Sequence, residues 1–268
     1  MKISKNDILI VLPLSILLIL GLVMVTSSSI YIADGMTSNP FHFAQRQTLF
    51  VSMGLIAMLI FLVLPSDFLY RTDWVFMLLS IFLLIILFIP DVGTSVNGSI
   101  RWIRIGPINI QPSEICKFSL ILYISGYSVR RMSEINSLRS FLKPLILLFI
   151  ISILIMGQPD LGSTAIVCML VVGILFYAGI SFFQLTLLIL LIALLGYLAI
   201  TTSPMRLARV LAFTDPFAID VVQKAGWQLS NSLISIGQGG WLGVGLGNSF
   251  QKSFFLPEAH TDFIFAIL

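Results

Sequence analysis

Long apolar runs separated by short polar stretches dominate this chain. The runs cover residues 8–25, 48–64, 74–89, 115–129, 144–156, 163–180 and 183–200, and another begins at residue 262 and continues to residue 268. About 20 apolar residues in a helix, at a rise of about 1.5 Å each, cross a hydrocarbon core of roughly 30 Å. The pattern therefore predicts an all-α fold, a polytopic membrane helical bundle with seven helices and the start of an eighth.

Composition leads to the same class of protein. Of the 268 residues, 58% are hydrophobic and only 10% are charged, whereas soluble domains carry about 25% charged residues. A signal peptide is the competing interpretation of the first run. That run is longer than a secretory h-region of about 7–15 residues, and Thr26-Ser27-Ser28 makes a poor cleavage site. Cys116 and Cys168 lie in apolar runs without metal-ligand spacing, which indicates buried thiols.

Residues 201–262 differ from the rest because they are glycine-broken and polar. We expect a single membrane domain over residues 1–268, truncated at its C-terminus, in which 201–262 form a large extracytoplasmic loop. Within this loop the polar and apolar residues of 227–238 fall on opposite faces of a helix, which predicts an interfacial amphipathic helix. Gly239, Gly243 and Gly247 recur every four residues, a spacing that permits close helix contact.

Lysines and arginines in the short loops set the orientation. Lys2 and Lys5, together with the loop over residues 130–143, predict a cytoplasmic N-terminus. Residues 30–46, 91–113, 157–162 and 201–262 then lie outside. This outer side holds many cations: Arg46, Arg101, Arg104, Lys117, Arg206, Arg209, Lys224 and Lys252. Cations on the side where the rule disfavours them are candidates for binding an anion.

The 91–113 loop has internal order. Residues 101–105 and 108–111 flank Gly106-Pro107, which predicts a short hairpin with Trp102 at the membrane interface. The sequence from Gln111 to Glu114 then opens a helix with a proline and an acid in its first turn. Glu114 and Lys117 are three residues apart and can pair. The pair is either an ordinary interfacial ion pair or a functional one.

Three acids and a histidine on the predicted outer side complete the candidates. Asp160 lies in the turn 157–162, where it either only shapes a tight reversal or also positions the arginines. Asp262 begins an apolar run, so it is either a helix N-cap or a catalytic acid-base group. Glu258 and His260 lie beside it. A metal bound by these three residues has weak support, and a nucleophilic triad has little, since the chain has only two histidines and no G-x-S-x-G turn.

Several strings resemble the SEDS family of peptidoglycan glycosyltransferases, in the same order along the chain. They are Asn97-Gly98, 101–103, 111–114 with Lys117, 157–162, 245–249, Gln251-Lys252 and 256–267. The residues Pro257 to Asp262, with the glycine-rich string before them, are more similar to the division branch of the family than to its elongation branch.

The resemblance implies a ten-helix protein of the bacterial cytoplasmic membrane, at the division septum. It would join lipid II units into glycan strands on the outer face and release undecaprenyl pyrophosphate. Asp262 matches the family's essential acid, and we expect it to act as general base on the acceptor 4-hydroxyl of an inverting glycosyltransferase. Trp102 matches a tryptophan of the substrate groove. Implied partners are a class B penicillin-binding transpeptidase and other divisome membrane proteins.

The predicted substrate-binding residues are Arg101, Trp102, Arg104, Glu114, Lys117, Asp160, Glu258 and His260, with the guanidinium and ammonium groups matched to diphosphate. No metal ligands are assigned, and a divalent cation, Mg²⁺ or Mn²⁺, is the only cofactor considered. No nucleic-acid partner is expected. The alternatives are a lipid II flippase and a scaffold for division proteins. A transporter often carries polar groups near the membrane midplane, whereas we expect ionisable residues at the outer boundary and none within the helices.

Overall fold

The structure, a computed structural model, describes residues 5–90, 92–96, 99–106, 108–218, 226–245, 248–249, 256 and 258–268. Its contacts divide the chain into two compact units. Unit 1 comprises Met1–Val63 and Ala199–Leu268, and unit 2 comprises Leu64–Leu198. The single membrane domain over residues 1–268 stays a prediction. Lys2, Asn97, Gly98, Lys224, Gln251, Lys252 and Pro257 lie outside the described residues.

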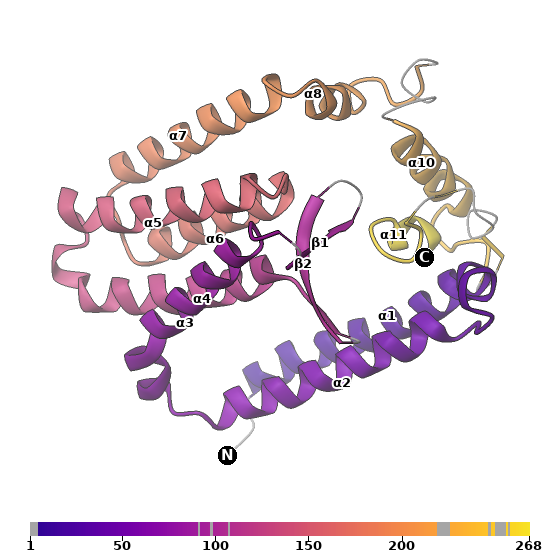
Figure 1. Cartoon of the computed structure of the whole chain (residues 1–268), viewed down its shortest axis with the longest axis horizontal. Coiled ribbons are helices and arrows are strands. Elements are labelled where there is room, and N and C mark those ends of the chain that lie inside the picture. The colour runs from indigo at the N-terminus through magenta and orange to yellow at the C-terminus, as the bar shows by residue number, and fades with distance from the viewer. Residues whose placement is uncertain are drawn as a thin grey trace. The chain divides into compact units, whose positions relative to one another are not determined.

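Unit 2 is built around one central helix. Its helical elements are α3 (Ser66–Ile86), α4 (Pro112–Arg130), the 3-10 turn η1 (Met132–Glu134), α5 (Leu138–Met156), α6 (Leu161–Tyr177) and α7 (Phe182–Thr201). Helix α4 packs against α3 and α6, and α5 packs against α6 (Figure 1). Cys116, Leu120 and Ile124, spaced four residues apart on α4, are fully buried, as the core-facing stripe of a helix requires.

Helix α4 begins as predicted. Gln111 is its N-cap, Pro112 occupies the first turn, and Glu114 is the acid of that turn. Proline suits the first helical position because its missing N–H would have no partner there. Near the other end, a Cβ at position 126 would collide with the Asp73 carboxylate of α3. Glycine at this position therefore allows the two helices to approach closely.

A three-stranded antiparallel sheet joins α3 to α4. It consists of β1 (Gly93–Val96), β2 (Ser99–Ile105) and β3 (Ile108–Ile110), in the order β1-β2-β3. Trp102 pairs with Thr94 on one side, and Arg104 pairs with Asn109 on the other. Gly106, with φ +60°, turns the chain between β2 and β3. The predicted hairpin is confirmed, and β1 is an additional strand.

Unit 1 joins the two ends of the chain. Its described helices are α1 (Lys5–Thr37), α2 (His42–Val63), α8 (Pro204–Leu211), α10 (Trp227–Gly239) and α11 (Ile264–Ile267). Helix α1 packs against α2 and α11, and α10 packs against α11 (Figure 1). A small core forms around α11, made of Met24, Leu256, Ala259, Ala266 and Ile267. The Ser235 hydroxyl also donates a hydrogen bond of 2.6 Å to the Ala266 carbonyl.

The expected outer loop over residues 30–46 is wrong. Helix α1 continues to Thr37 and α2 starts at His42, so only a short turn separates them. Polar side chains do not end α1 because they bond back to carbonyls one turn earlier. Thr26 donates to Leu22 over 2.7 Å, and Thr37 donates to Ala33 over 2.8 Å. Helix α5 also starts earlier than the predicted run over residues 144–156: it begins at Leu138, and Pro144 lies inside it.

A helix is present at 227–238, as α10, and its buried side chains are Ser230 and Ser232, while its interfacial placement stays a prediction. Ile236, on the predicted apolar face, is 40% exposed, so that face does not pack into unit 1. The predicted helix contact through glycines is wrong for Gly239 and Gly243, and Gly247 lies outside the described residues. Gly239 ends α10, and Gly243 has a φ of +75°, a backbone conformation of turns.

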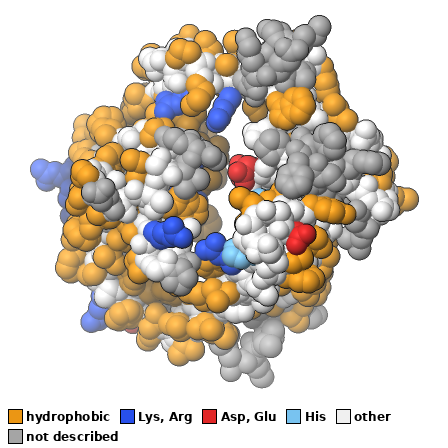
Figure 2. Space-filling view, turned by 45° about the vertical axis from the view of Figure 1, so that its right-hand side comes forward, with side chains coloured by type: hydrophobic (Ala, Val, Ile, Leu, Met, Phe, Trp, Pro, Cys, Tyr) orange, Lys and Arg blue, Asp and Glu red, His pale blue; other side chains and the backbone are white. Residues whose placement is uncertain are grey.

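Five of the described helices are long and apolar enough to cross a membrane: α1, α2, α3, α5 and α7. Helix α6 is apolar but shorter. Helix α4 carries Glu114, Lys117 and Arg130, and it is the most buried helix of unit 2. Hydrophobic side chains make up much of the face shown in Figure 2, as expected for helices that face lipid. The polytopic helical fold is therefore confirmed, with fewer candidate spans among the described residues than the seven predicted helices.

Candidate active site

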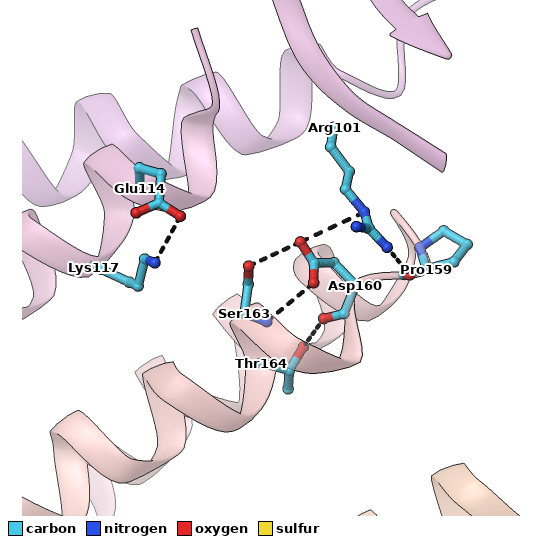
Figure 3. Close-up of polar contacts among 7 residues, drawn as sticks. All are labelled: Arg101, Glu114, Lys117, Pro159, Asp160, Ser163 and Thr164. Atoms are coloured by element: carbon cyan, nitrogen blue, oxygen red, sulfur yellow. Dashed lines mark hydrogen bonds and ion pairs between the residues drawn. The ribbon is translucent and has the colours of Figure 1, made fainter. Parts of the chain in front are cut away.

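An arginine of the sheet meets an aspartate at the start of α6. The Arg101 Nε atom lies 3.5 Å from Asp160 Oδ2, and Arg101 Nη2 donates a hydrogen bond of 2.6 Å to the Pro159 carbonyl (Figure 3). The Arg101 side chain is 35% exposed and that of Asp160 only 8%. The carboxylate thus holds a guanidinium whose remaining surface reaches solvent.

Asp160 has a structural function as well. It is the N-cap of α6: its Oδ1 accepts a hydrogen bond of 3.0 Å from the Ser163 amide, and its Oδ2 accepts one of 2.8 Å from the Ser163 hydroxyl. Such caps satisfy backbone donors that a helix leaves unpaired. Both functions considered from the sequence, shaping the turn and positioning an arginine, are therefore present in one carboxylate.

Strand β2 carries two of the predicted cations, Arg101 and Arg104. The pairing of β2 with β1 is irregular at Arg101: Thr94 pairs with Trp102 and Ser95 pairs with Ile100, so Arg101 is an extra residue in the strand. Such an irregularity bends a strand and re-aims a side chain. Arg101 meets Asp160, whereas Arg104 is exposed. The two arginines therefore differ in their surroundings, one held by a carboxylate and the other open to solvent.

Glu114 and Lys117 form the predicted pair at the start of α4. Lys117 Nζ lies 2.7 Å from Glu114 Oε1, with the lysine side chain 17% exposed and the glutamate side chain 56% exposed (Figure 3). Helix α4 packs against both β2 and α6. Because β2 carries Arg101 and α6 begins at Asp160, both ion pairs lie at the same end of unit 2.

Asp262 belongs to unit 1 and lies on a folded turn. The Glu258 carbonyl accepts hydrogen bonds of 3.2 Å from the amides of both Thr261 and Phe263. The Thr261 hydroxyl lies 2.8 Å from Glu258 Oε2. Glu258 itself has a φ of +55°, a conformation that non-glycine residues adopt mainly where the surroundings impose it.

The N-cap interpretation of Asp262 is wrong. Helix α11 begins at Ile264, its N-cap is Phe263, and no side chain caps it. The Asp262 side chain is exposed. Within the part of the chain that the structure describes, no hydrogen bond or ion pair engages it. This carboxylate is therefore not used to start the helix.

His260 packs against an aromatic ring from the other end of the chain. Its ring centroid lies 4.7 Å from that of Phe43, near the start of α2, with an angle of 48° between the ring planes. Its Nδ1 atom is buried and has no hydrogen-bond partner among the described residues. Sequence reasoning missed Phe43, because nothing in its neighbourhood distinguishes it from the other phenylalanines.

Each unit thus gathers part of the predicted site. Unit 2 brings Arg101 to Asp160 and Glu114 to Lys117, while Trp102 is half-buried and Arg104 is exposed. Unit 1 brings Glu258, His260 and Asp262 onto one turn. The catalytic and binding functions of all these residues stay predictions.

A charged pair between helices was also missed. Arg130 Nη1 lies 2.7 Å from Asp73 Oδ2, and the Asp73 side chain is only 1% exposed. The Arg130 guanidinium also lies over the Tyr70 ring, 5.1 Å from its centroid. The expectation that the helices hold no internal charge is therefore wrong for α3. The available signal was an acid directly before an apolar run, because a carboxylate that becomes buried requires a partner.

No group of three or more His, Cys, Asp or Glu side chains gathers as metal ligands among the described residues. His260, Glu258 and Asp262 share a turn, but the buried Nδ1 atom and the exposed Asp262 side chain do not form a common coordination site. The described residues do not fit a resident metal, and a divalent cation stays a prediction.

Known proteins resemble this chain along most of its length. A family model described as Cell cycle protein, for FtsW, RodA and SpoVE, matches residues 7–268. The probable peptidoglycan glycosyltransferase FtsW of Alkalilimnicola ehrlichii is 45% identical over 250 residues, which are 93% of this chain and 62% of that protein. The protein of the same name from Legionella pneumophila is 43% identical over 254 residues, 94% of this chain and 64% of that protein. The chain thus spans less than two thirds of the length of these relatives.

Solved structures share the fold. A variant of the rod shape determining protein RodA from Thermus thermophilus matches with a TM-score of 0.59 at 25% identity, over 70% of this chain and 59% of that chain. A chain from a structure titled "Structural coordination of polymerization and crosslinking by a peptidoglycan synthase complex" matches with a TM-score of 0.62 at 23% identity, over 84% and 65%. The second likeness shows the fold alone, and both agree with a polytopic helical protein.

Proposed function

Because the chain belongs to the FtsW, RodA and SpoVE family of cell cycle proteins, we propose that it polymerises lipid II into glycan strands. The reaction takes place on the outer face of the bacterial cytoplasmic membrane during septal cell-wall synthesis, and the N-terminus is cytoplasmic. Relatives named peptidoglycan glycosyltransferase FtsW support the reaction class. One structural observation carries the catalytic assignment: Asp262 is an exposed carboxylate on a hydrogen-bonded turn and does not cap the helix that follows.

Asp262 acts as the general base. Its carboxylate takes the proton from the 4-hydroxyl of the acceptor lipid II sugar, and the sugar oxygen attacks the anomeric carbon of the lipid-linked donor. A new glycosidic bond forms with inversion while the bond from the anomeric carbon to the diphosphate breaks. Undecaprenyl pyrophosphate leaves with the bonding electrons. An exposed carboxylate without an ion-pair partner keeps its lone pairs available for this proton transfer.

The cations of unit 2 hold the diphosphate. Arg101 is fixed by Asp160 and by the Pro159 carbonyl, so its planar guanidinium is oriented before the substrate arrives. Lys117 is mostly buried beside the exposed Glu114, so a phosphate can compete with that carboxylate for the ammonium. Arg104, which is exposed on the same strand, is a further cation for the diphosphate, and Trp102 lines the substrate groove. Glu258 and His260 contact the acceptor beside Asp262.

No step of this mechanism is assigned to a protein-bound metal, because the described residues provide no suitable ligand group. Mg²⁺ or Mn²⁺ would screen the diphosphate charge in the substrate itself. We propose a class B penicillin-binding transpeptidase and other divisome membrane proteins as partners. The structural neighbour whose title describes a peptidoglycan synthase complex supports such a partnership.

The test uses full-length purified protein in liposomes that contain lipid II. We expect Asp262→Asn to lower the rate of glycan formation by about 10²–10⁴-fold, the usual contribution of a general base, with unchanged thermal stability. Asp67→Asn is the matched control, because Asp67 is also an exposed acid but lies in the first turn of α3. Undiminished glycan product from the Asp262 variant would remove the assignment.

A lipid II flippase is the second candidate, and the buried Asp73–Arg130 pair favours it, since ionisable residues inside a helix bundle often mark transport pathways. The same liposomes separate the two functions. A polymerase produces glycan chains, whereas a flippase only moves fluorescent lipid II from one leaflet to the other. Translocation without chain growth in the wild-type protein would favour the flippase.

A further inference from the structure

The turn that carries Asp262 is anchored on both sides of this residue. Ala259 is fully buried, and Ala266 is buried with 7% of its surface exposed. The Glu258 carbonyl accepts the amides of Thr261 and Phe263. These contacts hold the backbone around Asp262, while its own side chain is exposed. The position of the carboxylate is therefore determined by its neighbours in the turn.

One of these anchors is an aromatic contact between distant parts of the sequence. The His260 ring packs against Phe43 at 4.7 Å between centroids. Its Nδ1 atom is buried without a hydrogen-bond partner among the described residues. The described contact of this ring is therefore packing and not a hydrogen bond on that nitrogen. Phe43 lies in the first turn of α2, a long helix that provides a rigid support.

We propose that Phe43 is a positioning residue for Asp262 and acts through the His260 ring. This inference rests on the proposed function of Asp262 as the base. A base must lie within hydrogen-bond reach of the proton it removes, and a displacement of about 1 Å at a reacting group can cost about 10²-fold in rate. The His260 ring thus connects Phe43 to the turn, in addition to its predicted contact with the substrate. A loss of the Phe43 ring frees the turn and moves the carboxylate.

The first experiment measures the turn without measuring catalysis. A spin label is attached at position 262 of the Asp262→Cys variant, in full-length protein in which Cys116 and Cys168 have been substituted. We expect Phe43→Ala to increase the mobility of the label. Phe41→Ala is the matched control, since Phe41 lies two residues earlier and its side chain is 53% exposed. An unchanged label spectrum in the Phe43 variant overturns the proposal.

The second experiment measures glycan formation with Asp262 in place. We expect Phe43→Ala to lower kcat by about tenfold to a hundredfold, with a smaller change in KM for lipid II, because the proposed diphosphate-binding cations Arg101 and Lys117 are left in place. Phe43→Trp should restore most of the rate by replacing the aromatic contact, and Phe41→Ala should match the wild type. An unchanged kcat, or a loss that appears only in KM, overturns the positioning function.

The two experiments separate this inference from the function on which it rests. If Asp262→Asn still polymerises lipid II, the assignment of the base fails, while the label at position 262 still reports whether Phe43 fixes the turn. If Asp262→Asn is inactive and the Phe43 variant has a normal rate and a normal spectrum, only the inference fails.

Discussion

Unit 1 and unit 2 differ in whether their acidic side chains are paired with cations. In unit 2, Asp73, Glu114 and Asp160 each lie within ion-pair distance of a cation. In unit 1, the Asp262 carboxylate has no such partner among the described residues and is exposed. Paired charges keep a fixed arrangement, whereas an unpaired carboxylate is free to accept a proton. In the proposed mechanism, this difference corresponds to electrostatic preorganisation by unit 2 and the acid-base step by unit 1.

The most buried pair gives the sharpest test of this comparison. Arg130→Gln leaves the Asp73 carboxylate buried without a cation, and we expect it to lower the free energy of unfolding by about 3 kcal/mol, as for other broken buried pairs. Asp73→Asn should cost only about 1 kcal/mol, because the Arg130 side chain is 35% exposed and can reach water. Denaturant titration in detergent measures both.

A double variant provides the control for this pair. Asp73→Asn combined with Arg130→Gln removes both charges, so its stability should lie above that of Arg130→Gln alone. If Arg130→Gln is no less stable than Asp73→Asn, the carboxylate is not held as the structure shows it, and the paired character of unit 2 is in doubt.

A smaller effect is expected at the cap of α6. Asp160→Ala removes an N-cap, which costs about 0.5–2 kcal/mol, and it also removes the partner of Arg101. We therefore expect a lower melting temperature together with a higher KM for lipid II. Asp160→Asn keeps a capping oxygen but loses the charge. Compared with Asp160→Ala, it should recover more of the wild-type melting temperature than of the wild-type KM. Equal recovery of both by Asn would mean that Asp160 serves the helix only.

The smallest effect on stability is expected at the start of α4. Glu114→Gln should change the free energy of unfolding by less than about 1 kcal/mol, because the Glu114 side chain is 56% exposed and exposed pairs contribute little. Lys117→Met should raise KM for lipid II much more than Glu114→Gln does, since it removes a charge that binds phosphate. Steady-state kinetics at two ionic strengths compares them. Similar KM values for the two variants would contradict the proposal that Lys117, and not Glu114, binds the phosphate.

Much of unit 2 could be predicted from the sequence because its signals are local. Apolar runs located the helices, Gly106 marked the hairpin, and the spacing of Glu114 and Lys117 predicted their pair. The bounds of α1 could not be predicted in this way. Residues such as Thr37 look like the start of a loop, and only the bond to the Ala33 carbonyl shows that they belong to the helix.

Contacts between distant segments were beyond the reach of pattern alone. Phe43 and His260 are ordinary residues until the fold brings their rings together. Asp73 and Arg130 pair because Gly126 leaves room for the carboxylate between α3 and α4. The irregular pairing at Arg101 could not be predicted either, because the pattern of residues along a strand does not show where an extra residue falls.

Strand β2 also restricts how this segment can change in length. Its pairing with β1 already accommodates one extra residue at Arg101. Deletion of a residue there would make the register regular and exchange the faces of the side chains on one side of the deletion. The contact of Arg101 with Asp160 therefore depends on the number of residues in this strand as well as on their identity.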